Sequence, residues 1–193
     1  QLDIFIAKNK IDTVINCAAY TAVDAAEENA VIAEQVNGAG VLNLVHALAK
    51  VKGKLIHIST DYVFDGHGFL PYQESDKTNP TGVYGKTKRN GELAVINGGI
   101  DGIGIRTSWL YSAYGTNFVK TMQRLGKERN ELDVIYDQLG TPTNASDLAK
   151  TCLDILAFSK ETNINAKGNI YHYSNEGVAS WYDFAKAIME LGK

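Results

Sequence analysis

At 193 residues, 45% of them hydrophobic, the chain is long enough to bury the core of one ordinary domain or most of a larger one. The net charge of −3 and the pI near 5.8 come from interspersed charges without a basic stripe, which argues against a nucleic-acid partner. No apolar run approaches the roughly 18 residues that a membrane span requires, and no signal-peptide pattern follows Gln1, so we expect a cytoplasmic protein.

The first elements in chain order are short apolar runs, rich in β-branched residues, that alternate with segments of helical period. This alternation is typical of an α/β protein whose mostly parallel sheet is covered by helices. Near-continuous apolar runs predict strands buried on both faces at 13–19, 54–60 and 104–110. Between the first two, apolar residues recur every three or four positions and stop before Gly53, which predicts a crossover helix and hence a βαβ unit.

The later part of the chain continues this alternation. Residues 145–158 and 181–191 have the pattern of amphipathic helices, with a short predicted strand at 169–173 between them. A doubly wound fold normally opens with a strand and a glycine-rich turn that binds pyrophosphate at a helix N-terminus. No Gly-x-Gly-x-x-Gly follows a strand in this sequence. We therefore expect that the N-terminal βαβ portion of a Rossmann-like sheet is missing from it.

The two cysteines, Cys17 and Cys152, lie far apart in the sequence. Neither has a second cysteine or a histidine at the spacing of a zinc site. Because free cysteine is among the residues most often buried, we predict two buried free thiols and no metal ligands.

The segment Tyr-Gly-Lys-Thr-Lys at 84–88 opens a helical pattern that continues through Leu93 and Val95. Tyr84 and Lys88 therefore lie one turn apart on the same helix face, where their side-chain heads can converge. A tyrosine with the ordinary pKa of about 10 is a poor proton donor, and we expect the Lys88 ammonium to lower the pKa of Tyr84 by favouring the phenolate. The pair would then form a general acid, although the pentapeptide alone also suits an exposed helix.

Small hydroxyl side chains stand at the end of the predicted strand at 54–60, in Ser59 and Thr60, followed by Asp61. Ligands of open α/β sheets bind at this carboxyl edge. Thr60 can donate a hydrogen bond to a carbonyl oxygen while Tyr84 protonates it, which would stabilise the charge that develops as hydride reaches the carbon. The alternative is that these residues only cap the following turn.

The predicted strand at 13–19 ends in small residues, Ala18 and Ala19. A dinucleotide that lies across strand ends needs small side chains beneath it, but an alanine pair equally suits packing between sheet and helix. Asn37 lies inside a predicted helix, where asparagine is unfavourable without a partner. It can hold a water or a backbone group, but we expect a solvated or capping side chain.

Several segments match a known family: Ala-Ala-Tyr-Thr-Ala-Val-Asp at 18–24, Ser-Thr-Asp-Tyr-Val-Phe-Asp-Gly at 59–66, Tyr-Gly-Lys-Thr-Lys at 84–88, Arg-Thr-Ser-Trp-Leu-Tyr at 106–111, Asn-Phe-Val at 117–119 and Asp-Gln-Leu-Gly-Thr-Pro-Thr at 137–143. With them, nearly the whole chain resembles the dTDP-4-dehydrorhamnose reductases, which are extended short-chain dehydrogenases. The resemblance implies reduction of the 4-keto group of dTDP-4-dehydro-6-deoxy-L-mannose to dTDP-L-rhamnose. It implies NADPH or NADH as the cofactor and a nucleotide sugar as the substrate.

Roles follow from this resemblance, position by position. It implies a catalytic triad of Thr60, Tyr84 and Lys88, with Lys88 also holding the nicotinamide ribose. The residues that it implies at the cofactor are Ala18, Ala19, Tyr20, Thr21, Ser59, Tyr84 and Lys88. The residues that it implies at the substrate are Thr60, Asp61, Trp109 and Asn117, with Asn117 toward the nucleotide.

The resemblance also implies an organisation of the chain. Residues 1–115 would form a dinucleotide-binding portion, and residues 116–193 would combine the remaining Rossmann elements with part of a sugar-nucleotide-binding lobe. The residue that chooses between NADPH and NADH has no counterpart in this sequence. Some family members carry Mg²⁺ at a dimer interface, so the resemblance allows a homodimer with Mg²⁺, whose ligands the sequence does not identify.

Two other functions fit the same motifs. A nucleotide-sugar epimerase shares the Tyr-x-x-x-Lys core, and the sequence does not show how much room a keto intermediate has to turn. A 4,6-dehydratase fits less well, because those enzymes place Asp-Glu after the threonine, whereas Asp61-Tyr62 follows Thr60. The regulatory β subunit of methionine adenosyltransferase also resembles this family, so a non-catalytic NADP-binding subunit is the second alternative. The intact set of Thr60, Tyr84 and Lys88 favours catalysis.

Overall fold

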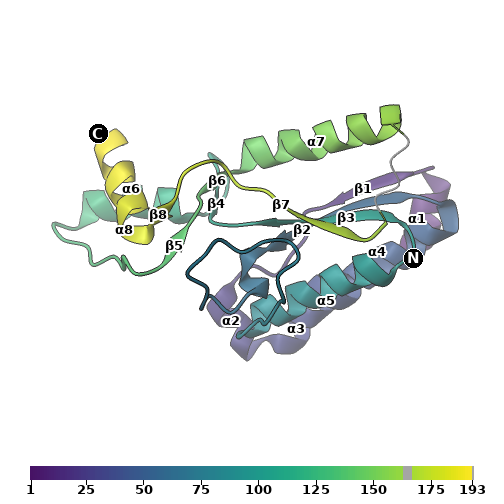
Figure 1. Ribbon diagram of the computed structural model, residues 1–193, viewed down its shortest axis with the longest axis horizontal. Helices are drawn as coiled ribbons and strands as arrows, with labels where there is room; N and C mark the ends of the chain where they lie inside the picture. The colour runs from purple at the N-terminus through teal and green to yellow at the C-terminus, as the bar shows by residue number, and fades with distance from the viewer. Residues whose placement is uncertain (163–166, 193) are drawn as a thin grey trace. The chain divides into compact units, whose positions relative to one another are not determined.

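A four-stranded sheet in the order β1-β2-β3-β7 lies at the centre of one part of the computed structural model, which describes residues 1–162 and 167–192 (Figure 1). Its strands are β1 (Thr13–Asn16), β2 (Lys54–Thr60), β3 (Asp101–Thr107) and β7 (Asn169–His172). β1 pairs with β2 in parallel, and β3 pairs with β7 in parallel. The predicted α/β fold class is confirmed.

Two of the predicted strands end earlier than their apolar runs do. β1 stops at Asn16 because the side chain of Asn16 accepts a hydrogen bond from the backbone N–H of Ala18 at 3.2 Å and turns the chain out of the sheet. The run predicted at 104–110 begins earlier, at Asp101, and ends at Thr107. Two residues later Trp109 has a φ of 47°, a left-handed conformation that interrupts extended chain.

The crossover between β1 and β2 is not one helix. It consists of α2 (Val23–Glu28), α3 (Ala30–Glu34), a π-helical turn (Gln35–Ala39) and α4 (Gly40–Val51). α4 ends as predicted before Gly53, but Lys52 takes the left-handed conformation, with a φ of 54°. Gly53 is needed for a close approach instead, since a Cβ there would lie 3.0 Å from the backbone oxygen of Asp12.

The main core lies where α4 and α5 (Val83–Asn97) cover one face of the sheet, beside α1 (Leu2–Lys8) (Figure 1). Apolar side chains recur on the inner face of α4 at helical spacing, so one stripe of the helix is buried. The buried members of this core are Ile6, Val41, Val45, Ala47, Leu48, Leu55, Val95 and Ile100.

A glycine brings α5 unusually close to the π-helical turn. A Cβ on Gly91 would overlap the backbone oxygen of Asn37 and would lie 3.0 Å from Nε2 of His57. Both neighbours are fully buried, and one of the two contacts is with backbone, so neither can move aside easily. Gly91 therefore sets the distance between α5, the crossover and β2.

The chain divides into two compact units, residues 1–106 with 156–172 and residues 107–155 with 173–193. In the second unit β4 (Leu110–Tyr111) pairs in parallel with β6 (Thr143–Asn144), and β5 (Leu139–Gly140) pairs antiparallel with β8 (Ala179–Ser180). Its helices are α6 (Phe118–Glu128), the first part of α7 (Ala145–Thr162) and α8 (Trp181–Leu191). α6 and α8 bury Met122, Ala185 and Ile188 between them.

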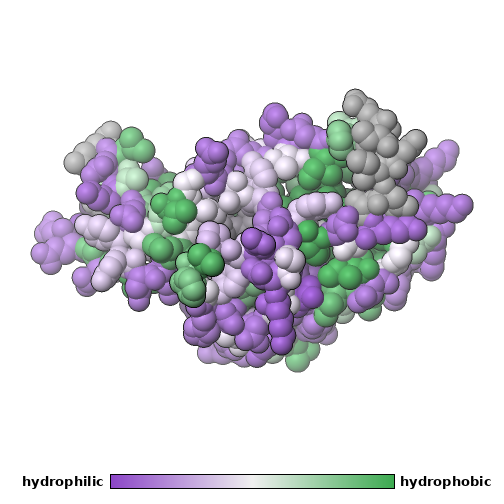
Figure 2. All heavy atoms as spheres, viewed as in Figure 1, coloured by the Kyte–Doolittle hydropathy of each residue, from purple (hydrophilic) through white to green (hydrophobic). Residues whose placement is uncertain are grey.

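The helix predicted at 181–191 is confirmed, and the one at 145–158 extends four residues further, to Thr162. The strand predicted at 169–173 ends one residue earlier, at His172. On the face shown in Figure 2, hydrophilic residues predominate and hydrophobic residues form separate patches. Across the described residues, no helix has both the length and the apolar character needed to cross a membrane.

The Gly91 contact predicts the effect of adding one methyl group. We expect Gly91→Ala to lower the free energy of unfolding by about 1–3 kcal/mol, even though alanine gains about 1 kcal/mol over glycine in helix propensity. Denaturant unfolding measures the change. Gly126→Ala in α6 is the matched control, because its Cβ would meet only the flexible end of Met189, and it should change stability by less than about 1 kcal/mol. Equal losses in the two variants would contradict the close approach.

Candidate active site

Three polar residues lie along one face of α5 at four-residue spacing: Tyr84, Lys88 and Glu92. The helix begins at Val83 because Gly82 has an extended conformation and the Val83 backbone N–H donates to the Glu27 carboxylate at 2.7 Å. This start places Tyr84 in the first turn, beside the end of β2.

Consecutive residues of β2 lie against these three side chains. Thr60 lies close enough to the Tyr84 hydroxyl to affect the pKa of Tyr84. The Lys88 ammonium donates to the backbone oxygen of Ile58 at 2.6 Å, and the Ser59 hydroxyl donates to Oε1 of Glu92 at 2.6 Å. The structure thus brings Thr60, Tyr84 and Lys88 together at the carboxyl end of a parallel strand, which is the edge where ligands of such sheets bind.

The Tyr84 hydroxyl holds its proton firmly. Burial raises the pKa of Tyr84 to about 12 and outweighs the lowering effect of the nearby Thr60 side chain, and the charge of Asp61 adds to the rise. The prediction that Lys88 lowers the pKa of Tyr84 is therefore wrong for this structure, because desolvation dominates at the hydroxyl and the ammonium is bound to the Ile58 oxygen. Tyr84 is consequently in the protonated state that a proton donor requires.

Lys88 responds to burial in the opposite direction. Its side chain is 2% exposed, and desolvation lowers the pKa of Lys88 to about 8, although the charges of Glu92 and Cys17 act to raise it. The group therefore changes charge close to neutral pH, unlike an ordinary surface lysine.

Thr60 has two local partners as well as Tyr84. Its hydroxyl donates to Oδ1 of Asp61 at 3.0 Å and accepts the backbone N–H of Tyr62 at 3.2 Å, which caps the 3₁₀ turn Asp61–Val63. Thr60 therefore caps this turn, but capping is not the only contact of these residues, because Thr60 also lies beside Tyr84 and Ser59 binds Glu92. Burial raises the pKa of Asp61, while the hydrogen bond from Thr60 opposes that rise. Ser59 is buried, and its hydroxyl donates to the Glu92 carboxylate.

The loop after β1 presents the other residues predicted at the cofactor. Ala18 and Thr21 are exposed, and Ala19 and Tyr20 are half-buried. Cys17 is also exposed, so its predicted burial is wrong: the chain leaves the sheet at Asn16 before this side chain can be covered. The burial predicted for the other cysteine, Cys152, is confirmed.

Asn37 fixes this loop to the helix. The side-chain oxygen of Asn37 accepts the backbone N–H of Tyr20 at 2.8 Å. Its nitrogen donates to the Tyr20 oxygen at 3.1 Å and to Oγ1 of Thr87 at 3.0 Å. The expectation of a solvated or capping Asn37 is therefore wrong, because the π-helical turn carries the side chain into a fully buried position.

Trp109 and Asn117, the remaining predicted substrate residues, belong to the second unit. The Trp109 ring stacks on Trp181 with ring centroids 3.6 Å apart and also covers Gly140. Asn117 caps α6: its side-chain oxygen accepts the Lys120 backbone N–H at 3.2 Å, and its nitrogen donates to the Ser112 oxygen at 2.7 Å. Within their unit, the two side chains are held by an aromatic stack and by a helix cap.

The sequence reasoning missed a buried ion pair next to the site. Glu92 is fully buried, and Arg106 of β3 donates to both of its oxygens, at 2.8 and 2.9 Å. Burial by itself would raise the pKa of Glu92, but hydrogen bonds from Arg106 and Ser59 together with the Arg106 charge outweigh burial and lower it. One feature of the sequence could have indicated Glu92. It follows Lys88 by four residues, as Lys88 follows Tyr84, so all three lie on one helix face.

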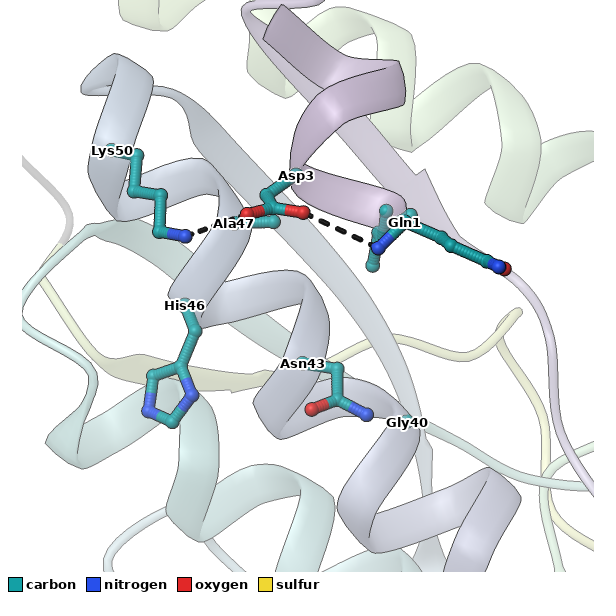
Figure 3. Close-up of a pocket in the computed structure, with 8 residues that line it drawn as sticks. Gln1, Asp3, Gly40, Asn43, His46, Ala47 and Lys50 are labelled. Atoms are coloured by element: carbon teal, nitrogen blue, oxygen red, sulfur yellow. Dashed lines mark hydrogen bonds and ion pairs between the residues drawn. The ribbon is translucent and has the colours of Figure 1, made fainter.

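A surface depression of about 460 Å³ lies between α1 and α4, away from these residues (Figure 3). There Asp3 bridges the Lys50 ammonium at 2.7 Å and the Gln1 amino group at 3.4 Å, and the hydrogen bond from Lys50 lowers the pKa of Asp3 to about 2. None of the predicted site residues lines it. No cluster of three or more metal-ligating side chains occurs in the described part of the chain.

The parallel strand pairs of the sheet, covered by α4 and α5, define a Rossmann-like α/β protein. The chain belongs to the RmlD substrate-binding domain family, whose sequence model matches residues 1–193. It is 46% identical over 182 residues to the dTDP-4-dehydrorhamnose reductase of Burkholderia thailandensis, covering 93% of this chain. The match covers 61% of that relative, so the chain spans only part of the length of the curated proteins it matches.

Solved structures agree with this assignment. The dTDP-4-dehydrorhamnose reductase of Clostridium acetobutylicum superposes with a TM-score of 0.91 at 43% identity, covering 99% of this chain and 65% of that one. The Bacillus anthracis reductase, solved in complex with NADP, has a TM-score of 0.91 at 40% identity, with coverages of 99% and 66%.

His57, beneath the site, predicts a dependence of stability on pH. Its Nδ1 is 3.1 Å from the side-chain nitrogen of Asn16, and burial, with the charge of Lys88, lowers the pKa of His57 from 6.5 to about 3. Below pH 6.5 this histidine is protonated in the unfolded chain but stays neutral in the folded protein. The free energy of unfolding therefore decreases as the pH falls toward 3. The loss should reach about 2 kcal/mol between pH 7 and pH 5.

Denaturant unfolding of His57→Gln at the two pH values measures this contribution. The difference in stability between pH 7 and pH 5 should be smaller than in the parent by about 2 kcal/mol. His46→Gln, at an exposed position on α4, is the control and should keep the parent's difference. If His57→Gln also keeps it, His57 is not held neutral by burial.

Proposed function

We propose that this chain forms the catalytic part of a dTDP-4-dehydrorhamnose reductase. Such an enzyme would reduce the 4-keto group of dTDP-4-dehydro-6-deoxy-L-mannose to dTDP-L-rhamnose with NADPH or NADH. The supporting observation is the placement of Tyr84 and Lys88 on one face of α5 beside Thr60 at the carboxyl end of β2, where burial raises the pKa of the Tyr84 hydroxyl. The relatives at 40–46% identity that are named as reductases of this kind also support it.

The residues at this edge suit a nicotinamide dinucleotide. The Lys88 ammonium has three donors, one of which binds the Ile58 oxygen, so it can also bind ribose hydroxyls. The loop that contains Ala18, Ala19, Tyr20 and Thr21 offers two small alanines and an exposed threonine beneath a flat ligand, next to the half-buried Tyr20 ring. Ser59 suits this role less well, because its hydroxyl is bound to Glu92. A relative from Bacillus anthracis binds NADP, which supports this class of cofactor.

The reduced nicotinamide would supply the hydride that reaches C4 of the sugar. Tyr84 would donate its proton to the 4-oxygen, and Thr60 would donate a hydrogen bond to the same oxygen as negative charge develops. Lys88, whose ammonium donates to the Ile58 oxygen, would hold the nicotinamide ribose next to Tyr84. Asp61, Trp109 and Asn117 are the residues that we propose for contact with the nucleotide sugar.

The remaining assignments extend the same proposal. Residues 1–115 would form the dinucleotide-binding portion, and residues 116–193 would combine further Rossmann elements with part of the lobe that binds the nucleotide sugar. A homodimer in the cytoplasm fits this type of enzyme. The epimerase and the regulatory-subunit alternatives are not favoured, because the curated relatives at 40–46% identity include several that are named as reductases.

Replacing the proton donor tests the mechanism. We expect Tyr84→Phe to lower kcat by about 10²–10⁴-fold, because the phenol proton is lost while the ring remains. The measurement follows the absorbance of NADPH with the 4-keto nucleotide sugar and the intact protein. Tyr171→Phe, on β7, is the matched control and should keep the parent's kcat. A Tyr84→Phe variant with unchanged kcat would exclude this tyrosine as the acid.

A further inference from the structure

The carboxylate of Glu92 has four charged or polar donors in a fully buried position. Oε1 accepts from the Ser59 hydroxyl at 2.6 Å and from Nε of Arg106 at 2.8 Å. Oε2 accepts from the second Arg106 nitrogen at 2.9 Å and from Arg89 at 2.8 Å. A carboxylate is rarely buried so completely unless every lone pair is used, and the proposed reduction gives Glu92 no direct task.

Arg106, its main partner, is itself held on several sides. Its guanidinium lies 4.9 Å from the centre of the Phe64 ring, and its third nitrogen is 3.3 Å from Nε2 of His172 on β7. The backbone of His172 donates in turn to the Glu74 carboxylate at 3.0 Å. The ion pair therefore joins α5 to β3 and β7, and Glu92 cannot shift without moving these neighbours.

The same carboxylate is part of the ladder between α5 and β2. Successive turns of the helix place Tyr84 beside Thr60, bind the Ile58 oxygen through Lys88 and bind the Ser59 hydroxyl through Glu92. Glu92 is the only member of this ladder whose side chain also reaches β3. Glu92 therefore fixes its helix turn to both β2 and β3. The two preceding turns carry Tyr84 and Lys88, the residues of the proposed proton chemistry.

Charge connects Glu92 to Lys88 as well. The charges that raise the pKa of the buried Lys88 are those of Glu92, on the next helix turn, and Cys17, after β1. The Lys88 charge in turn lowers the pKa of His57 on β2. Glu92 has the largest charge effect on Lys88 and opposes the desolvation that lowers its pKa. Arg89, Arg106 and His172 surround Glu92 on its other sides.

We propose that Glu92 is a positioning residue, which locks the helix turn of Lys88 and Tyr84 against the end of β2 and places a carboxylate one helix turn from the Lys88 ammonium. The role in turnover rests on the proposed reductase function. The effect on Lys88 does not, because it is a property of the protein without ligand.

The test follows the titration of Lys88 by NMR in protein with ¹³C-labelled lysine, where Lys88→Met identifies the signal. In Glu92→Gln the midpoint of Lys88 should fall by about one pH unit, because an opposite charge one turn away is lost. The alkaline limb of the kcat profile should move to lower pH by a similar amount. A residue with a purely structural role would lower stability and leave the Lys88 midpoint unchanged.

A second variant protects the test against misfolding, because Glu92→Gln leaves Arg106 buried without its partner. Glu92→Met with Arg106→Met replaces the pair by apolar side chains of similar size, a change that buried ion pairs often tolerate. The Lys88 midpoint should fall in this variant too, by a smaller amount, since a positive charge is removed with the negative one. Ser59→Ala keeps the Glu92 charge and removes the hydrogen bond from Ser59 to Glu92. It should therefore lower kcat severalfold and leave the titration midpoint of Lys88 unchanged.

Glu128→Gln is the matched control, because it removes a glutamate that is paired with Arg124 on the surface of α6. It should change neither the midpoint nor kcat. An unchanged Lys88 midpoint in folded Glu92→Gln or in the double variant would overturn the inference and leave the reductase proposal standing. A parent protein that consumes no NADPH would overturn the reductase proposal, and the Lys88 titration would still decide the role of Glu92.

Discussion

The contact between α5 and the end of β2 is the constraint on which the candidate site depends. Tyr84 and Lys88 come from the helix, and the residues that they lie against, Thr60 and Ile58, come from the last three residues of the strand. Gly91 permits the approach, because any side chain there would collide with the crossover. Asn37 ties the loop after β1 to the same helix through Thr87. Segments from three separate parts of the sequence are thus fixed by a single helix.

Burial at this contact shifts the pKa values of Tyr84 and Lys88 in opposite directions for one reason. Removing water disfavours whichever form is charged, so the pKa of Tyr84 rises and that of Lys88 falls. The tyrosine therefore keeps its proton, and the lysine becomes sensitive to the charges around it. A buried carboxylate such as Glu92 can then influence the lysine in a way that it could not in water, where the higher dielectric weakens such interactions.

The period of apolar residues along the sequence predicts much of the fold. Where a predicted strand differs from the observed one, the cause is local. The limits predicted for β2 are those observed, because its apolar run is buried on both faces and ends where hydroxyl residues begin. The run at 13–19 was overextended, because apolar character does not reveal that the Asn16 side chain turns the chain. The strand predicted at 104–110 also ends earlier than its apolar run, since Trp109 adopts a left-handed conformation that few residues other than glycine favour.

The sequence by itself determined the α/β class, the four-residue spacing of Tyr84 and Lys88, and the strand-end position of Thr60, because these depend on periods of two and 3.6 residues along the chain. Only the tertiary structure decided which protonation states the side chains hold and which partners they have. Asn37 and Glu92 show the difference. Their donors and acceptors come from residues up to 50 positions away, and burial depends on contacts that no local pattern contains.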